Sequence, residues 1–189
     1  PLNTAYTPAE VEYFISDSGA RMLIANDADS LQPLVSTHQV ILHNMAADGS
    51  GSFTDLAATA SDAYAPAERG GDDLAAFLYT SGTTGRSKGA MLTQNNLLSN
   101  AETLIDEWRF TEDDVLLHAL PIFHTHGLFV ATNIILLARA SMIFLPKFDV
   151  DMVFAALPQV TSMMGVPTFY TRLLDDQRLT MQSTSHMRL

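Results

Sequence analysis

The chain has 189 residues, 47% of them hydrophobic and 16% charged, so it can bury a core and does not have the composition of a disordered protein. Its 21 acidic and 10 basic residues give a net charge of −11, which disfavours nucleic-acid binding because that requires a basic surface. The absence of cysteine excludes disulfides, thiolate zinc sites and a cysteine nucleophile. No hydrophobic run reaches about 18 residues and no signal peptide is recognisable, so we expect a cytoplasmic protein without a membrane span.

The first part of the chain predicts a helix with well-marked ends. Thr7 can cap this helix, Pro8 suits its first position, and Glu10 completes a capping box. Gly19 predicts the end of the helix, because glycine readily adopts the left-handed conformation found there. Two short buried strands are expected after the helix, over residues 22–25 and 40–42.

A polar segment separates this first βα part, residues 1–43, from the rest of the chain. Residues 44–73 are rich in small and polar side chains and predict a loop or linker, with one helical turn near 53–58. Residues 1–73 contain 11 acidic and 2 basic side chains, whereas residues 74–189 contain 10 and 8. The second part is therefore the better host for an anionic ligand.

Strands and helices alternate beyond the linker. The expected strands cover residues 74–79, 115–120, 142–145 and 160–164, and the expected helices cover residues 94–108, 127–138, 150–157 and 167–174. This alternation predicts an α/β fold with a mostly parallel sheet flanked by helices. Ligands of such sheets bind at the carboxyl ends of the strands.

The densest chemical signal is the segment of residues 79–89, YTSGTTGRSKG, between the first of these strands and the first of these helices. Its glycines allow backbone N–H groups to approach a phosphate closely, and its serine and threonine hydroxyls add donors. Lys88 adds a positive charge. The segment therefore predicts a cradle for a triphosphate or pyrophosphate. It is not a Walker A loop, because Ser87 stands where that motif has glycine.

This segment closely resembles the phosphate-loop signature of the adenylate-forming family, which includes acyl-CoA synthetases, luciferases and peptide-synthetase adenylation domains. The family usually has proline where this chain has Ser87, a minor departure because Gly85 and Lys88 are both present. Residues 120–127 and 165–168 resemble the family segments that line the carboxylate pocket. The resemblance covers essentially all 189 residues and implies the large N-terminal domain of such an enzyme.

Within the family, the chain most resembles malonyl-CoA synthetases. This subgroup resemblance is carried by residues 108–110, His124 and His126, and residues 144–149 and 164–170. It implies an ATP-dependent acid–thiol ligase that converts malonate, ATP and coenzyme A into malonyl-CoA, AMP and pyrophosphate through a malonyl-adenylate, with Mg²⁺ screening the phosphates. Two alternatives stay open: a ligase for another short or aromatic carboxylic acid, such as methylmalonate or coumarate, and a non-catalytic nucleotide-binding fragment.

The resemblance also implies which residues act. It implies that Lys88, Thr84 and His124 are catalytic. It also implies that His124, Thr125 and His126 bind the substrate carboxylates, with Arg172 as a further candidate. A histidine beside the second carboxylate of a dicarboxylic acid can donate a hydrogen bond or carry charge. The residues implied to bind the ATP phosphates are Thr80, Ser81, Gly82, Thr83, Thr84, Gly85 and Lys88.

We expect no metal site within the chain, because His124 and His126 lack a third ligand nearby in the sequence. His38, His43 and His118 are expected to be structural. The family's adenine-binding, ribose-binding and C-terminal lid segments would lie beyond residue 189. We therefore expect residues 1–189 to be an internal fragment of the N-terminal AMP-binding domain that is inactive alone.

Overall fold

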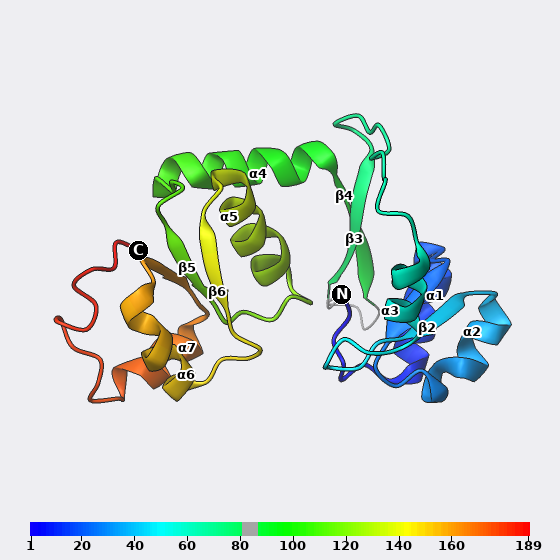
Figure 1. The fold of residues 1–189 in the computed structure, drawn as a ribbon, viewed down its shortest axis with the longest axis horizontal. Helices are drawn as coiled ribbons and strands as arrows, with labels where there is room; N and C mark the ends of the chain where they lie inside the picture. Colours follow the sequence, from blue (N-terminus) through cyan, green and yellow to red (C-terminus); the bar gives the residue numbers. More distant parts are fainter. Residues whose placement is uncertain (81–86) are drawn as a thin grey trace. The chain divides into compact units, whose positions relative to one another are not determined.

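The computed structural model describes residues 1–80 and 87–189 (Figure 1). These residues form two compact units. The N-terminal unit comprises Leu2–Gly70 and Phe77–Met91, and the sheet unit comprises Gly71–Ala76 and Leu92–Leu189 together with Pro1. Strands β3 (Leu74–Thr80) and β4 (Lys88–Thr93) are hydrogen-bonded neighbours, and each contributes residues to both units.

Helix α1 (Pro8–Ser18) of the N-terminal unit has the predicted ends. The Thr7 hydroxyl accepts the Glu10 N–H at 3.4 Å, and the Glu10 carboxylate accepts the Thr7 N–H at 2.8 Å. Gly19 ends the helix with φ 65°. These contacts satisfy backbone groups that the helix itself leaves unpaired, so the capping-box prediction is confirmed.

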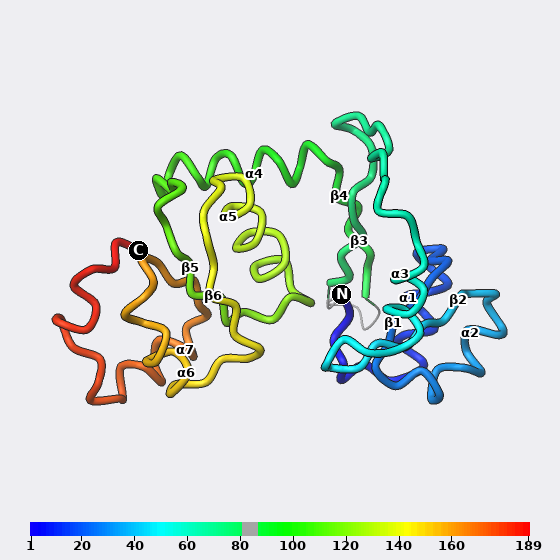
Figure 2. The backbone as a smooth tube through the Cα atoms, viewed as in Figure 1, coloured from blue at the N-terminus to red at the C-terminus, as the bar shows by residue number. Residues whose placement is uncertain are grey.

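The remainder of the N-terminal unit contains a parallel strand pair and two short helices. Figure 2 shows β1 (Met22–Ala25) beside β2 (Ile41–Asn44). Between them lie the 3-10 turn η1 (Asp29–Leu31) and helix α2 (Gln32–His38), which the sequence analysis did not predict. Helix α3 (Ser52–Thr59) contains the helical turn expected in the linker. The core of this part is small, formed by the buried side chains of Val11, Ile15, Val35 and Val40.

The sheet unit contains a three-stranded parallel sheet in the order β6-β5-β7, as predicted for an α/β fold. The central strand is β5 (Val115–His118), flanked by β6 (Ser141–Phe144) and β7 (Ser162–Met164). Strand β5 ends two residues earlier than expected and β7 begins two residues later, because the hydrophobic runs extend past the paired residues, whereas β6 is shifted by one residue toward the N-terminus. Both faces of the sheet are covered, which explains why its strands are mostly apolar rather than alternating.

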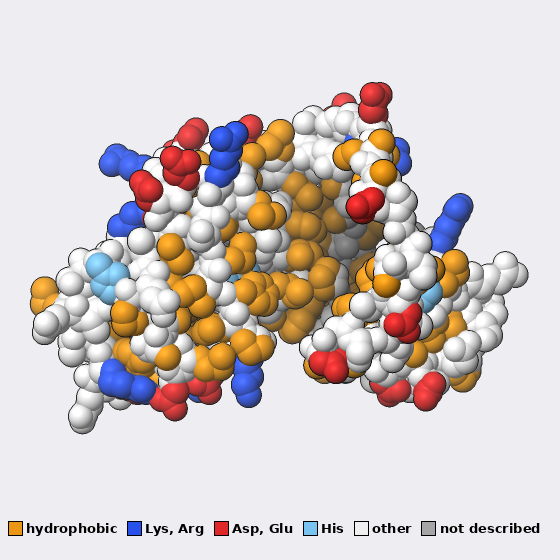
Figure 3. Space-filling view, in the orientation of Figure 1, with side chains coloured by type: hydrophobic (Ala, Val, Ile, Leu, Met, Phe, Trp, Pro, Cys, Tyr) orange, Lys and Arg blue, Asp and Glu red, His pale blue; other side chains and the backbone are white. Residues whose placement is uncertain are grey.

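Two pairs of helices cover the two faces of this sheet. Helices α4 (Gln94–Trp108) and α5 (Thr132–Ala138) pack around Leu116, whereas α6 (Val150–Ala156) and α7 (Pro167–Leu174) pack around Leu117. A 3-10 turn, η3 (Leu157–Gln159), follows α6. In the space-filling view, charged side chains gather over α4 and hydrophobic ones gather around α5, β6 and α6 (Figure 3).

The helix expected over residues 127–138 is divided. It begins as a π-helix, η2 (His126–Ala131), and continues as α5. Gly127 is required at this start, because a Cβ there would lie 2.5 Å from the Pro121 carbonyl oxygen. Within the described parts of the chain, no helix is both long and apolar enough to cross a membrane.

Candidate functional site

Two of the predicted phosphate-binding residues can be placed. Thr80 ends β3 and Lys88 begins β4, and both are exposed. The Thr80 hydroxyl lies 3.5 Å from the Lys88 carbonyl oxygen. Strand β4 is a correction to the sequence analysis, which expected the loop to lead directly into a helix. The other predicted members, Ser81, Gly82, Thr83, Thr84 and Gly85, lie outside the described residues.

Helix α1 makes a hydrogen bond to a described residue on each side of this segment. The Tyr13 hydroxyl donates a hydrogen bond to the carbonyl oxygen of Ser87 at 2.7 Å. The Tyr79 hydroxyl donates to the Asp17 carboxylate at 2.8 Å. Burial, together with the Asp17 carboxylate, raises the pKa of Tyr79 to about 12, so this hydroxyl remains a donor at neutral pH. No local pattern indicates this role for Tyr13, because its partner is 74 residues away.

The predicted carboxylate-binding histidines follow β5 in the sheet unit. His124 and Thr125 are exposed, and His126 is half-buried as the first residue of η2. The ring of His124 lies 4.6 Å from that of Phe123. Backbone bonds shape this turn, since the His124 N–H donates to Pro121 at 3.3 Å and the His124 carbonyl accepts the Leu128 N–H at 3.0 Å. The segment therefore lies at the carboxyl end of the central strand, as expected for a ligand site.

His126 favours the neutral imidazole. Burial, and to a lesser degree the nearby His118, holds the pKa of His126 below its ordinary value of 6.5. A neutral imidazole still has one N–H to donate. At neutral pH His126 can therefore donate a hydrogen bond to an anionic oxygen without first carrying a charge.

His118 is a buried residue of this region that the sequence analysis expected to be structural. It ends β5, and its Nε2 atom lies 2.8 Å from the Gly127 carbonyl oxygen. Its ring stacks on that of Phe144 at 4.6 Å. The sequence feature that could have drawn attention to His118 is that it is a polar residue within the otherwise apolar run of residues 115–120.

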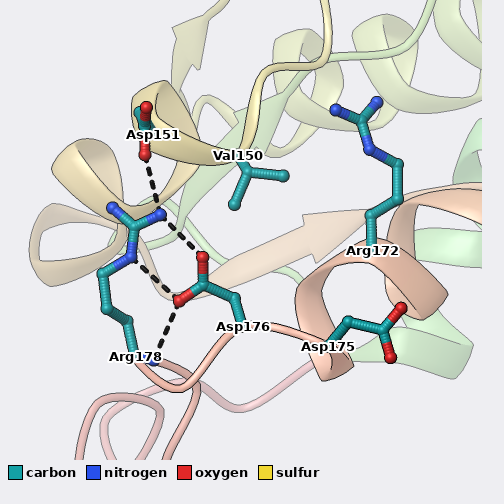
Figure 4. A pocket seen from close by; sticks show the side chains of 6 residues that line it. All are labelled: Val150, Asp151, Arg172, Asp175, Asp176 and Arg178. Atoms are coloured by element: carbon teal, nitrogen blue, oxygen red, sulfur yellow. Dashed lines mark hydrogen bonds and ion pairs between the residues drawn. The ribbon is translucent and has the colours of Figure 1, made fainter.

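Arg172 lies on α7, exposed, with its guanidinium 4.9 Å from the centre of the Phe148 ring. In Figure 4 it extends away from a neighbouring ion-pair cluster in which Arg178 binds Asp151 and Asp176, each at 2.7 Å. Within residues 1–80 and 87–189, no hydrogen bond or ion pair joins Arg172 to the histidine segment. Its role in carboxylate binding thus remains a prediction.

The described residues do not provide a metal cage. Among residues 1–80 and 87–189, no three His, Asp or Glu side chains come close enough together to hold a metal ion. Mg²⁺ is commonly bound through one or two carboxylates together with phosphate oxygens of the substrate. The side chains described here therefore assign no protein ligand to Mg²⁺.

Comparison with known proteins identifies the family. The sequence profile of the AMP-binding enzymes matches residues 1–189, which is the whole chain. The chain belongs to this family. It is 36% identical over 184 residues to the mitochondrial malonate–CoA ligase ACSF3 of Mus musculus, a match that covers 93% of this chain and 31% of the mouse protein.

Solved structures agree with this assignment. The ATP-bound crystal structure of MatB from Rhodopseudomonas palustris superposes with a TM-score of 0.95 at 57% identity, covering 100% of this chain and 38% of MatB. A malonyl-CoA ligase in a ternary product complex with methylmalonyl-CoA and AMP gives a TM-score of 0.81 at 29% identity, covering 100% of this chain and 39% of that one. The chain thus spans about a third of the length of these relatives.

Proposed function

We propose that this chain forms part of an ATP-dependent ligase that converts malonate, ATP and coenzyme A into malonyl-CoA, AMP and pyrophosphate. The observation that carries the proposal is its similarity to a malonate–CoA ligase over 93% of its length. Because the chain spans 31% of that relative, the activity is proposed for the complete protein that contains it. ATP binding is supported by the family match and by the ATP-bound MatB structure.

The proposed reaction has two steps. A malonate carboxylate oxygen attacks the α-phosphorus of ATP, and the bond to the bridging oxygen breaks so that pyrophosphate leaves. The thiolate of coenzyme A then attacks the acyl carbon of the malonyl-adenylate, and AMP leaves with the electrons of the broken C–O bond. The first step brings two anions together, so positive charge and hydrogen-bond donors near the phosphates lower its barrier.

The side chains of this chain have distinct roles in the proposal. Lys88 and Thr80, with the residues of the signature between them, bind the ATP phosphates, and the Lys88 ammonium stabilises negative charge on the departing pyrophosphate. His124 contacts the reacting carboxylate. His126 donates its N–H to the second carboxylate, with Thr125 beside it and Arg172 as a further partner. A buried carboxylate needs such donors, because desolvation without them is costly.

A ligase for methylmalonate is the second candidate, supported by the related malonyl-CoA ligase that holds methylmalonyl-CoA. Both candidates predict that the pocket recognises a second carboxylate. They differ in whether the pocket has space for the extra methyl group of methylmalonate. A hydrophobic pocket discriminates between two acids that differ by one such group by only about 1–3 kcal/mol.

The test is acid-dependent pyrophosphate release by the complete protein. Malonate is expected to give the highest kcat/KM, ahead of methylmalonate and far ahead of acetate, coumarate and octanoate. A higher kcat/KM with coumarate or octanoate would contradict the dicarboxylate assignment. No release with any of the acids would support a non-catalytic nucleotide-binding role instead.

A further inference from the structure

The imidazole of His118 is buried in the sheet unit, with 1% of the residue exposed. It ends β5, the central strand, and its Cα is in register with those of Phe144 on β6 and Met164 on β7. Burying a polar ring costs free energy unless its nitrogen atoms are hydrogen-bonded. A histidine in this position therefore requires a hydrogen-bond partner. A buried leucine would require none.

That contact is the carbonyl of Gly127. The oxygen lies 2.8 Å from His118 Nε2, and it also accepts the Thr132 hydroxyl at 2.9 Å. A carbonyl oxygen only accepts hydrogen bonds, so Nε2 carries the proton. His118 Nδ1 is buried and has no partner among the described residues. Because Nε2 faces a carbonyl oxygen and Nδ1 faces no partner, the geometry specifies Nε2 as the nitrogen that donates.

The Gly127 carbonyl lies next to the proposed carboxylate-binding residue. Gly127 directly follows His126 in η2, and a Cβ at Gly127 would collide with the Pro121 carbonyl. The π-helix is rare and recurs at functional sites. Here two side-chain donors, one from β5 and one from α5, hold the carbonyl at its start. These two donors restrain the peptide group that follows Gly127, one residue beyond His126.

We propose that His118 is a positioning residue, whose Nε2–H holds the Gly127 carbonyl and thereby orients His126 toward the second carboxylate of the substrate. This inference rests on the proposed function, which assigns that role to His126. Thr132 supports the same carbonyl from α5. His118 itself makes no contact with the substrate.

The first test compares two substitutions in the complete protein. His118→Gln keeps an amide N–H at about the reach of Nε2, whereas His118→Leu preserves the volume and removes the donor. We expect His118→Leu to raise the KM for malonate about tenfold while the KM for ATP stays within about twofold, and His118→Gln to restore most of the malonate KM. Equal malonate KM values for the two variants would overturn the inference.

Thr132→Val gives a second test, with less disturbance of the core. It removes the other donor to the Gly127 carbonyl, and we expect the KM for malonate to rise about threefold. The matched control is Thr37→Val on α2, which removes a similar hydroxyl bond to the Pro33 carbonyl and should leave the KM unchanged. An unchanged malonate KM in Thr132→Val would contradict the claim that this carbonyl orients the pocket.

A measurement without turnover separates this inference from the proposed function. ¹⁵N NMR of the unsubstituted protein should show a proton on His118 Nε2 that is hydrogen-bonded, and an Nε2 atom without a proton would overturn the inference. If the unsubstituted protein releases no pyrophosphate in the presence of malonate, the proposed function is overturned instead. The malonate pocket that His118 is proposed to support is then overturned as well. Normal release together with equivalent Leu and Gln variants overturns only the positioning role.

Discussion

Lys88 is exposed at the start of β4 in the N-terminal unit. His126, in contrast, is half-buried in the sheet unit, and the strand that precedes it ends at the buried His118. The charge of Lys88 needs only to reach a phosphate, and its long side chain tolerates small backbone shifts. The N–H of His126 must meet one oxygen atom, so its direction matters. We infer that the first residue acts mainly through charge and the second through placement by the core.

The substitution Lys88→Ala provides the largest expected effect. Loss of its charge should slow adenylate formation by about 2–4 kcal/mol, roughly 30- to 1,000-fold, because charge builds up on pyrophosphate in the transition state. ATP–pyrophosphate exchange with malonate measures this rate in the complete protein. The matched control is Lys147→Ala, which removes another exposed lysine and should leave the exchange unchanged. An unchanged exchange rate in Lys88→Ala would remove the phosphate-binding role.

The comparison also shows what the sequence could predict. The capped helix α1, the parallel sheet and the helices on its faces were predictable, because capping residues and hydrophobic periodicity are local signals. Strand β4 was missed, since its residues follow the glycine-rich segment and show no clear alternation. Tyr13 was missed as well, and His118 was expected to be structural without its partner Gly127 being predicted. Their partners are distant in sequence or belong to the backbone, and neither kind of contact leaves a pattern in the chain.

Stability of the sheet unit can be tested at Asp114, which is buried and accepts hydrogen bonds from Arg188, Thr111 and Thr161. Asp114→Asn should lower the free energy of unfolding by about 2 kcal/mol, a typical value for bonds to a charged group. Larger losses are not expected, since 35% of the Arg188 side chain is exposed and solvent screens the pair. Asp113→Asn, an exposed neighbour, is the control.

The same carboxylate predicts a pH dependence. Hydrogen bonds from Arg188 hold the pKa of Asp114 to about 2, against an ordinary value of 3.8. A lowered native pKa stabilises the fold above pH 3.8, and this contribution is lost as the pH falls toward 2. Denaturant unfolding between pH 4 and pH 2 should therefore show a smaller decline for Asp114→Asn than for the unsubstituted protein. Identical declines would contradict the assigned ion pair.

A smaller effect is expected on the phosphate side, at the support that Tyr13 gives to Ser87. Tyr13→Phe removes the hydroxyl donor and should raise the KM for ATP about fivefold, which corresponds to roughly 1 kcal/mol for one hydrogen bond. Tyr64→Phe serves as the control, because Tyr64 is 79% exposed. A KM for ATP that matches the control would show that phosphate binding by Lys88 does not depend on the Tyr13–Ser87 hydrogen bond. Lys88 would then differ further from His126, whose role depends on its placement.

The smallest expected change is in the titration of His126. Because burial lowers its pKa, its NMR midpoint should lie below 6.5 in the free protein, and acidification through 6.5 should destabilise the fold through this group. Malonate should raise the midpoint, since a nearby carboxylate favours the imidazolium, and butyrate should raise it less. A midpoint at or above 6.5 without ligand would contradict the half-buried placement.

Selectivity between a dicarboxylate and a monocarboxylate tests the central claim most directly. The measurement is the kcat/KM for malonate divided by that for butyrate, in the complete protein and in its His126→Leu variant. The account predicts that the ratio falls about tenfold or more, roughly 1.4 kcal/mol, because only malonate leaves a second carboxylate without its donor. An unchanged ratio would contradict the account and assign recognition of the second carboxylate to other residues.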